Sequence, residues 1–330
     1  MKPALTVILP AMLGVRTVEA AINAWEGQTC RERIEMMVLC PDTELASQLL
    51  DPSWVKVCTK STLLHQARAK AVQLASADTV MFAEDHCLPN SHVAEKMLAR
   101  AAEGWEVVGP SLQAGVETPA GGASFLIGYG QWMPPVQSGP IADLPGHNVV
   151  VSRKILTDQG ECLSDCLFVQ GMFFQQLRKQ GRHYFLESEA RMVHYDPPKL
   201  SKNLPIFVVN GLSVGAVRAE DWWWPLRSAY AFAFPFVATA HWIRAFRQQM
   251  RIGASISQSL KRLIAAIPLA FAWGMGESAG AVLGRRRVEG LSWRSEVKPV
   301  SIESVAAFES ASQIHSLPAK TVHTQSTTEN

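Results

Sequence analysis

Hydrophobic and polar positions follow a repeating order through the first third of the chain, in which short apolar runs alternate with longer amphipathic segments. The short runs predict five buried strands, at 5–9, 34–39, 54–58, 80–82 and 105–109. The longer segments carry apolar residues spaced by three and four, and they predict four helices, at 17–27, 43–50, 61–76 and 91–103. This alternation is typical of the α/β class, with a mostly parallel, doubly wound sheet flanked by helices.

The next stretch, 111–148, contains many Gly, Pro and aromatic residues and has no clear period, so we expect a long structured loop there. Asn90 or Ser91 is expected to cap the helix that begins near His92, and Gly181 to end a later helix. The elements predicted beyond the loop are a strand at 149–151, a helix at 168–179, and short strands at 184–186 and 190–193.

The composition changes after about residue 205, which predicts three regions: 1–204, 205–295 and 296–330. The second region holds two apolar runs, 229–240 and 263–275, which follow Trp222–Trp224 and are flanked by Arg and Lys. Neither run reaches the ~20 residues of a spanning helix, so the pattern favours amphipathic helices in the membrane interface. A packed helical subdomain or a dimer surface is the alternative. The third region is dominated by Ser, Thr, Glu and Gln, which predicts a disordered tail.

The overall composition narrows the class of protein. The chain of 330 residues is 48% hydrophobic, which is ample for a core, and its net charge of +2 argues against a general affinity for nucleic acid. Its six cysteines form no C-x-x-C pair and no zinc spacing, so we expect reduced thiols in a cytosolic chain. Because the first predicted strand begins at Leu5, we expect no signal peptide.

Three polar residues, Glu84, Asp85 and His86, follow the apolar strand at 80–82. In an open α/β sheet, ligands usually bind at the carboxyl ends of the strands. Carboxylates and an imidazole can together bind a divalent cation. These residues therefore predict a cation site at the rim of the sheet. The alternative is that Glu84 and Asp85 only solvate a turn.

Five segments, in this order along residues 4–198, resemble motifs of glycosyltransferase family 2. The first strand and its loop match the opening pattern of that family, and the helix that carries Arg68 is similar to its ARNxGxxxA segment. Phe82–Pro89 is similar to its metal-binding LDDDxxP segment, and Gly146–Asn148 resembles its GxN loop. The sequence LRKQG followed by ARMVH is similar to its closing pattern. The resemblance implies the nucleotide-diphospho-sugar transferase fold of type A, called GT-A below.

The resemblance also implies a reaction and a set of site residues. A sugar would leave a nucleotide-diphosphate donor, and Mn²⁺ or Mg²⁺ would stabilise the charge of the leaving diphosphate. The implied metal ligands are Glu84, His86 and His194, and imidazole suits Mn²⁺ better than Mg²⁺. For His194 a capping or core role is the alternative, and for Arg68 a solvated helix face. The implied donor-binding residues are Asp42, Arg68, Asp85, His147 and Asn148.

Two positions depart from the family pattern. The base-contacting Asp of the family falls on or near Cys40, and Asp42 is its nearest substitute. The general base falls on Gln170, whose amide cannot accept a proton at neutral pH. Asp165 or Glu161 could act instead, as could His147, or the chain has lost activity. A helix cap is the alternative role for Asp165.

We therefore expect a glycosyltransferase that is peripheral on the cytoplasmic face of the cell membrane, where region 200–290 is similar to membrane-associated members with a GExxG element. Its acceptor would be lipid-linked or a polysaccharide. The alternative hypothesis, motivated by Cys40 and Gln170, is a catalytically inactive nucleotide-binding or scaffold protein. A nucleotidyltransferase is a weaker option, because residues 10–16 lack a Gly-rich phosphate loop.

Overall fold

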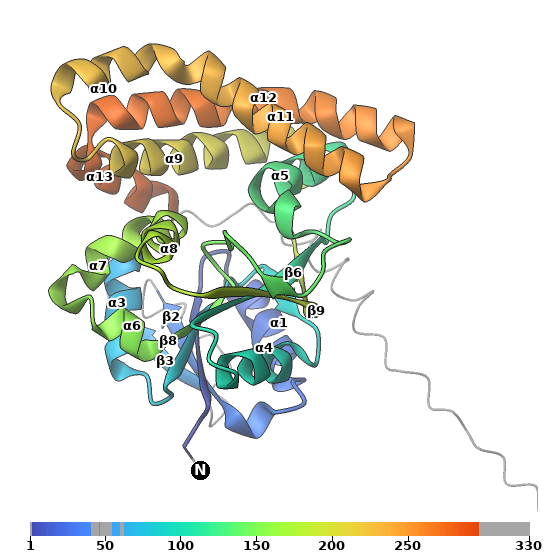
Figure 1. Cartoon of the computed structure of the whole chain (residues 1–330), viewed down its shortest axis with the longest axis vertical. Coiled ribbons are helices and arrows are strands. Elements are labelled where there is room, and N and C mark those ends of the chain that lie inside the picture. Colours follow the sequence, from blue (N-terminus) through green and yellow to red (C-terminus); the bar gives the residue numbers. More distant parts are fainter. Residues whose placement is uncertain (1, 41–45, 47–54, 60–62, 297–330) are drawn as a thin grey trace, which may run out of the picture.

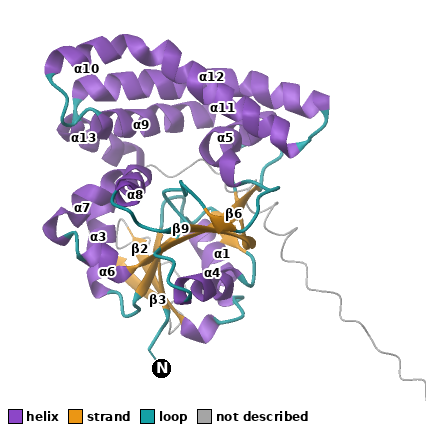
Figure 2. Cartoon of the chain, viewed as in Figure 1, coloured by secondary structure: helices purple, strands orange, loops and turns teal. Residues whose placement is uncertain are grey.

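A computed structural model describes residues 2–40, 46, 55–59 and 63–296 of the chain. It contains a mixed nine-stranded sheet with helices packed against it, and a layer of helices across one end of the sheet (Figures 1 and 2). The predicted α/β class is therefore confirmed. The predicted helix at 43–50, apart from Ala46, lies outside the described residues, as does 297–330 of the predicted tail.

The sheet has the strand order β3-β2-β1-β4-β8-β6-β9-β5, and β7 pairs with β9. Neighbours β3, β2, β1 and β4 are parallel, as are β6 and β9, whereas β8 is antiparallel to both β4 and β6. It follows that β4 and β9 point in the same direction. The strands are β1 (Leu5–Pro10), β2 (Ile34–Cys40), β3 (Val55–Thr59), β4 (Thr79–Phe82), β5 (Cys87–Pro89), β6 (Val107–Ala114), β7 (Gly139–Pro140), β8 (Val150–Ser152) and β9 (Tyr184–His194).

The central parallel strands β1 and β2 are buried on both faces, which explains their largely apolar sequences. Every residue of β1 and β2 is buried, and Trp25 of α1 packs in the same core. The helix α4 starts after His92, whose side chain does not cap it, and the Ala94 amide instead donates to the Gln28 side chain over 3.0 Å, so the expected cap by Asn90 or Ser91 is wrong. The helices of this part are α1 (Val15–Glu26), α3 (Leu64–Leu74), α4 (Val93–Ala102), α6 (Arg153–Thr157), α7 (Leu163–Cys166) and α8 (Gln170–Lys179).

The expected loop at 111–148 is wrong, because this stretch contains ordered elements. Strand β6 continues to Ala114, and a helix, α5 (Pro119–Tyr129), follows it with the Thr118 hydroxyl as its cap. Residues 121–127 of α5 are all buried, so the helix has no polar face and no amphipathic period. The two short strands expected at 184–186 and 190–193 are one strand, β9, with a register shift opposite Pro110 and Ser111.

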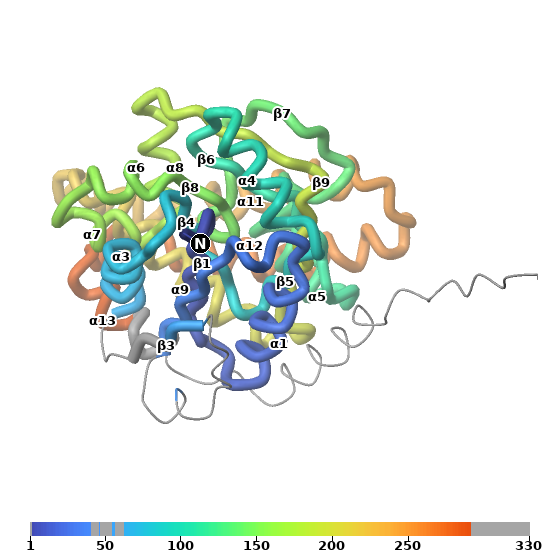
Figure 3. The backbone as a smooth tube through the Cα atoms, turned by 90° about the horizontal axis from the view of Figure 1, so that it is seen from below, coloured from blue at the N-terminus to red at the C-terminus, as the bar shows by residue number. Residues whose placement is uncertain are grey.

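The remaining helices form the layer that we call the helical layer, and Figure 3 shows it behind the sheet when the chain is seen from below. Within it, α9 and α12 run against each other at very short range. A Cβ at Gly211 or Gly215 would overlap the backbone of α12, and one at Gly276 or Gly280 would overlap that of α9. The layer consists of α9 (Leu200–Arg218), α10 (Trp224–Tyr230), α11 (Phe234–Ile252), α12 (Ile256–Leu283) and α13 (Arg285–Glu296).

The length argument against spanning helices is wrong for this layer. The second apolar run is part of α12, a helix of 28 residues, and α9 adds another of 19 residues; both are long and apolar enough to cross a membrane. Length and composition alone do not decide the matter, because core helices of soluble proteins have the same properties. More than half of the most apolar window of α12 is buried inside the protein.

Candidate metal centre

The topology brings three potential metal ligands to one edge of the sheet. Glu84 follows the end of β4, and His194 is the last residue of β9, which points in the same direction. His86 precedes β5, which pairs antiparallel with β9 and places Cys87 opposite His194. The Tyr195 amide donates to the His86 carbonyl over 2.9 Å, which closes this pairing.

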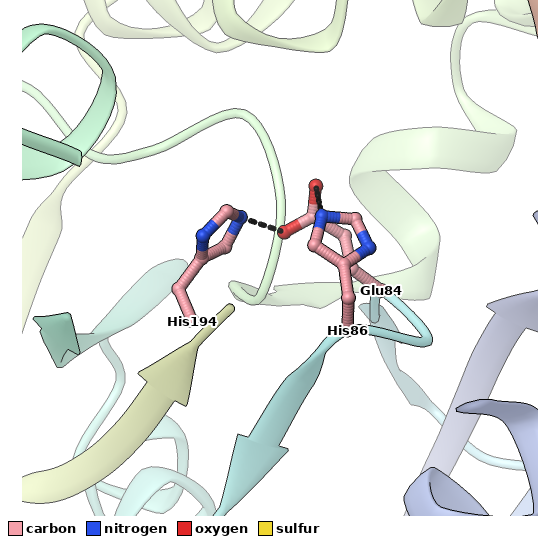
Figure 4. Close-up of side chains that lie close together, drawn as sticks. All are labelled: Glu84, His86 and His194. Atoms are coloured by element: carbon pink, nitrogen blue, oxygen red, sulfur yellow. Dashed lines mark ion pairs between the residues drawn. The ribbon is translucent and has the colours of Figure 1, made fainter. Parts of the chain in front are cut away.

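The side chains of Glu84, His86 and His194 converge, and one ligand atom from each lies within 4.8 Å of the other two (Figure 4). The Nε2 atom of His86 is 3.9 Å from one oxygen of Glu84, and the Nε2 atom of His194 is 3.7 Å from the other. Both distances are too long for hydrogen bonds. Two imidazoles and one carboxylate with room between their ligand atoms form a donor set that a divalent cation can occupy.

Each histidine is held at its other nitrogen by an aspartate. The Nδ1 atom of His86 is 3.0 Å from Asp85, and that of His194 is 2.9 Å from Asp196. Asp196 also accepts a hydrogen bond from the hydroxyl of Ser124 in α5. In metal sites this arrangement fixes the tautomer and directs Nε2 at the cation. The buried Nε2 atom of His194 has no hydrogen-bond partner, so a ligand position is left open at the cluster.

Asp85 is fully buried, and its partners are other residues of the protein. One of its oxygens accepts hydrogen bonds from the Met12 and Leu13 amides, at 2.8 and 2.7 Å, and from Thr17 at 3.3 Å. The other faces His86. Both oxygens are therefore engaged, and Asp85 ties the loop after β1 to the cluster.

The loop before β8 supports Glu84 from the other side. The Asn148 side chain donates to Glu84 over 2.8 Å, and the backbone amide of Asn148 donates to the Phe82 carbonyl over 2.6 Å. Asn148 has a left-handed backbone with φ of 61°, a conformation that Asn tolerates better than most residues. Gly146 lies against the backbone of Gly171 in α8, where a side chain would not fit. This contact brings His147 to the site, with its Nε2 atom 3.9 Å from Glu84.

The charges of the cluster are strongly coupled. Burial opposes ionisation of Glu84, but His147, His86, His194 and the hydrogen bond from Asn148 together hold its pKa at about 2. Burial disfavours the charged form of His86, yet the hydrogen bond to Asp85 and the nearby carboxylates raise its pKa to about 9. Burial lowers the pKa of His147 to about 4 in spite of Glu84, so this ring is neutral at pH 7.

Other predicted site residues lie elsewhere or at the edge of the cluster. Arg68 is buried on α3, close enough to His147 for its charge to lower the pKa of that ring. Asp165 is exposed on α7, where Arg285 of the helical layer binds it over 3.0 Å, so the structure does not bring it to the cluster. Gln170, the expected position of the base, is buried in the first turn of α8. Asp42 lies outside the described residues.

Two residues that support the cluster were missed by sequence reasoning. Asp196 is two residues after His194, and this His-x-Asp spacing at a strand end was a usable signal. Tyr129 comes from α5, its hydroxyl lies 3.4 Å from Glu84, and its ring lies against that of His194. No local pattern identifies Tyr129, because it reaches the site through a helix that the sequence did not predict.

The chain was also compared with known proteins. No protein-family model matches it, and no curated protein is similar to it at a significant level.

Proposed function

We propose that this protein is a metal-dependent glycosyltransferase of the GT-A type. It moves a sugar from a nucleotide-diphosphate donor to a lipid-linked or polysaccharide acceptor at the cytoplasmic face of the cell membrane. The observation that carries the proposal is the convergence of Glu84, His86 and His194 at one edge of the sheet, where β4 and β9 end, with an aspartate behind each histidine. The parallel unit β3-β2-β1-β4, followed by the antiparallel β8, supports the fold assignment.

The donor set decides which cation fits. A site with two imidazoles and one carboxylate suits Mn²⁺ better than Mg²⁺, which prefers oxygen ligands and near-ideal octahedral geometry. When bound, the cation supplies stabilisation of the negative charge that develops on the departing diphosphate. Asp85 and Asp196 orient the two rings, and Asn148 holds one oxygen of Glu84.

The remaining roles go to residues that border the cluster. Arg68 can contribute a cationic donor for the diphosphate, because guanidinium binds phosphate oxygens in a fixed fork. Asp42, which is outside the described residues and two positions after Cys40 in the sequence, keeps its predicted role at the base of the nucleotide. Asp165 of α7 is bound to Arg285 of α13. His147 is therefore the neutral group beside Glu84 that can accept the proton of the acceptor hydroxyl.

The experiment is a thermal-shift screen of nucleoside diphosphates and nucleotide sugars, with and without Mn²⁺. A ligand present at 100 times its Kd adds about 2.7 kcal/mol to the free energy of unfolding. We expect a selective rise in Tm that requires Mn²⁺ and is lost in His86→Gln. The matched control is His92→Gln, which changes an exposed histidine outside the site. A full nucleotide-sugar response in the presence of EDTA would contradict the proposal.

A second candidate function is a catalytically inactive transferase that binds a nucleotide as a scaffold. The buried Gln170 favours it, because it occupies the expected position of the base, beside His147, and an amide is no base. Nucleotide binding by titration calorimetry without release of nucleoside diphosphate, over a range of acceptor extracts, would select this function. Restoration of transfer in Gln170→Glu would identify the missing base.

A further inference from the structure

The segment from Trp222 to Gly276 differs from the rest of the chain in charge. It contains six Lys or Arg residues and no Asp or Glu, whereas the whole chain has 31 basic and 29 acidic residues. This segment forms α10, α11 and most of α12 in the helical layer. Its basic residues are Arg227, Arg244, Arg247, Arg251, Lys261 and Arg262.

The same segment exposes a long apolar stripe. Along α12, six exposed large apolar side chains recur at intervals of three or four residues. Such spacing places them on one face of the helix. These residues are Ile256, Leu260, Ile264, Ile267, Phe271 and Met275. The opposite face of α12 is buried against α9 and α11, so the exposed stripe is not needed for packing within the chain.

Exposed aromatic side chains also occur on α10, on α11 and on the short turn between them. Trp223 and Trp224 at the start of α10 are 69% and 76% exposed, and Phe232 and Phe236 are each 79% exposed. Trp is enriched at membrane–water interfaces, where its amphipathic ring sits at the depth of the headgroups. Exposed aromatic and aliphatic side chains of this number are unusual on a monomer in water.

Charge complementarity selects the occupant of this surface. A second copy of the chain would bring two acid-free, basic surfaces together, and their like charges would repel. The headgroups of an anionic bilayer carry the opposite charge and attract Lys and Arg near the surface, at roughly 1 kcal/mol per residue. The exposed Arg244, Arg247 and Lys261 therefore favour lipid over self-association.

The packing of α12 decides how the layer meets the bilayer. One face of α12 contacts α9, α11 and also α5, which belongs to the α/β part of the chain. The helices α9, α11 and α12 run side by side across one end of the sheet (Figure 1). If α12 crossed the bilayer it would lose its packing on α5, whereas a helix lying in the plane of the interface keeps that packing and buries only its apolar stripe.

We propose that the helical layer is a membrane-docking surface that lies flat on an anionic bilayer, with the stripe of α12 and the aromatic residues of α10 and α11 inserted at headgroup depth. This inference does not rest on the transfer reaction. The docked layer also holds the candidate metal centre near the bilayer, because α5 packs on α11 and α12 and carries Tyr129 to Glu84.

The test is flotation of the full chain with vesicles of phosphatidylcholine alone, or of phosphatidylcholine mixed with phosphatidylglycerol. We expect binding to the mixed vesicles that weakens as salt is added. Ile264→Glu should reduce the affinity roughly tenfold or more, because it places a charge in the inserted stripe. Arg244→Gln with Arg247→Gln should reduce only the preference for the anionic lipid.

The matched control is Leu74→Glu, because Leu74 is 55% exposed and Ile264 is 57% exposed, but Leu74 lies on α3 of the α/β part. It should leave vesicle binding unchanged. Circular dichroism shows whether each variant is folded. The proposal is overturned if the folded wild-type chain floats with neither vesicle, or if Leu74→Glu and Ile264→Glu reduce binding equally. It is also overturned if the wild type is a dimer in solution that does not bind vesicles and that Ile264→Glu converts to a monomer.

Discussion

The α/β part and the helical layer each bury a glutamate, and the two carboxylates have opposite surroundings. In the helical layer, Glu277 is surrounded by donors: Arg218, the Tyr230 hydroxyl at 2.7 Å and the Trp273 indole at 2.9 Å. In the α/β part, Glu84 accepts from Asn148 at 2.8 Å and only weakly from Tyr129 at 3.4 Å. Its other neighbours are the Nε2 atoms of histidines, at 3.7 to 3.9 Å.

The difference shows that burial alone does not identify a functional carboxylate. Glu277 has both oxygens engaged by donors, so its site is closed and serves the packing of the layer. Glu84 faces imidazole nitrogens that lie beyond hydrogen-bond distance, so they do not satisfy the carboxylate directly and leave room for a cation between them. The open arrangement is therefore the one that can bind a ligand.

The largest expected difference between the two glutamates is in the free energy of unfolding that is lost when each is replaced. Glu277→Ala leaves the Tyr230 hydroxyl and the Trp273 indole without their acceptor, at about 1–3 kcal/mol each, while the half-exposed Arg218 can turn to solvent. Glu84→Gln keeps the shape of the side chain but removes the charge beside the histidines, and it should lower the free energy of unfolding by the smaller amount of about 1–2 kcal/mol. Urea denaturation of both variants measures this contrast. Equal losses would show that the Glu84 cluster is also a closed structural network.

A second effect concerns the close crossing of α9 and α12, which the α/β part does not share. Gly215→Ala places a methyl group on the carbonyl oxygen of Glu277, so the helices must separate, at a cost of about 1–3 kcal/mol. The matched control is Gly290→Ala on α13, where no described atom outside the helix's own backbone lies within 4 Å of the added methyl. That change should raise the free energy of unfolding by up to about 1 kcal/mol through helix propensity. Equal urea midpoints for the two variants would rule out the tight crossing.

The sequence predicted the two regions unequally. In the α/β part, strands buried on both faces appear as apolar runs, so β1, β2 and β4 were expected close to their observed bounds. The polar residues after β4 then indicated Glu84 and His86, because ligands bind at the carboxyl ends of the strands in an open α/β sheet, and the family resemblance added His194. The structure brings these three residues together.

What the sequence did not predict depends on tertiary contacts. The helix α5 has small and apolar residues on all sides, so no period distinguishes it from a loop, and Tyr129 was missed with it. Asp165 was proposed from its distance along the chain to α8, but α7 directs it to Arg285 of a distant helix. The close α9–α12 packing depends on glycines whose spacing indicates small residues on one face and not which helix they meet.

A third prediction tests whether Asp196 supports His194 as a metal ligand in the Glu84 cluster. Asp196→Asn keeps the size of the side chain but removes the charge behind the Nδ1 atom of His194. Loss of such a supporting partner typically weakens metal binding by 10–100-fold, which corresponds to about 1.4–2.7 kcal/mol. Titration calorimetry with Mn²⁺ measures it, and Asp158→Asn, an exposed aspartate on the surface, is the control. Wild-type affinity in Asp196→Asn would mean that His194 is not a ligand.

The smallest expected effect tests whether a closed carboxylate in the α/β part behaves like Glu277. Glu35 of β2 accepts hydrogen bonds from Thr6 at 2.7 Å, from the Ser76 amide and hydroxyl, both at 2.8 Å, and from Lys56. Burial opposes its ionisation, but these donors lower its pKa from 4.5 to about 2. Glu35→Gln should therefore cost roughly 1–2 kcal/mol at neutral pH.

The pH dependence of that cost has a definite sign. Because the folded-state pKa of Glu35 lies below its ordinary value, its stabilising contribution is fully present above about pH 4.5 and is lost as the pH falls toward 2. The difference between the wild type and Glu35→Gln in urea denaturation should therefore shrink over this range. The difference in the free energy of unfolding could instead stay constant from pH 7 to the lowest pH at which both proteins fold. That result would mean that the charge of Glu35 does not contribute to stability. In that case Glu35 would not share the donor-satisfied character of Glu277, and the contrast with Glu84 would rest on the helical layer alone.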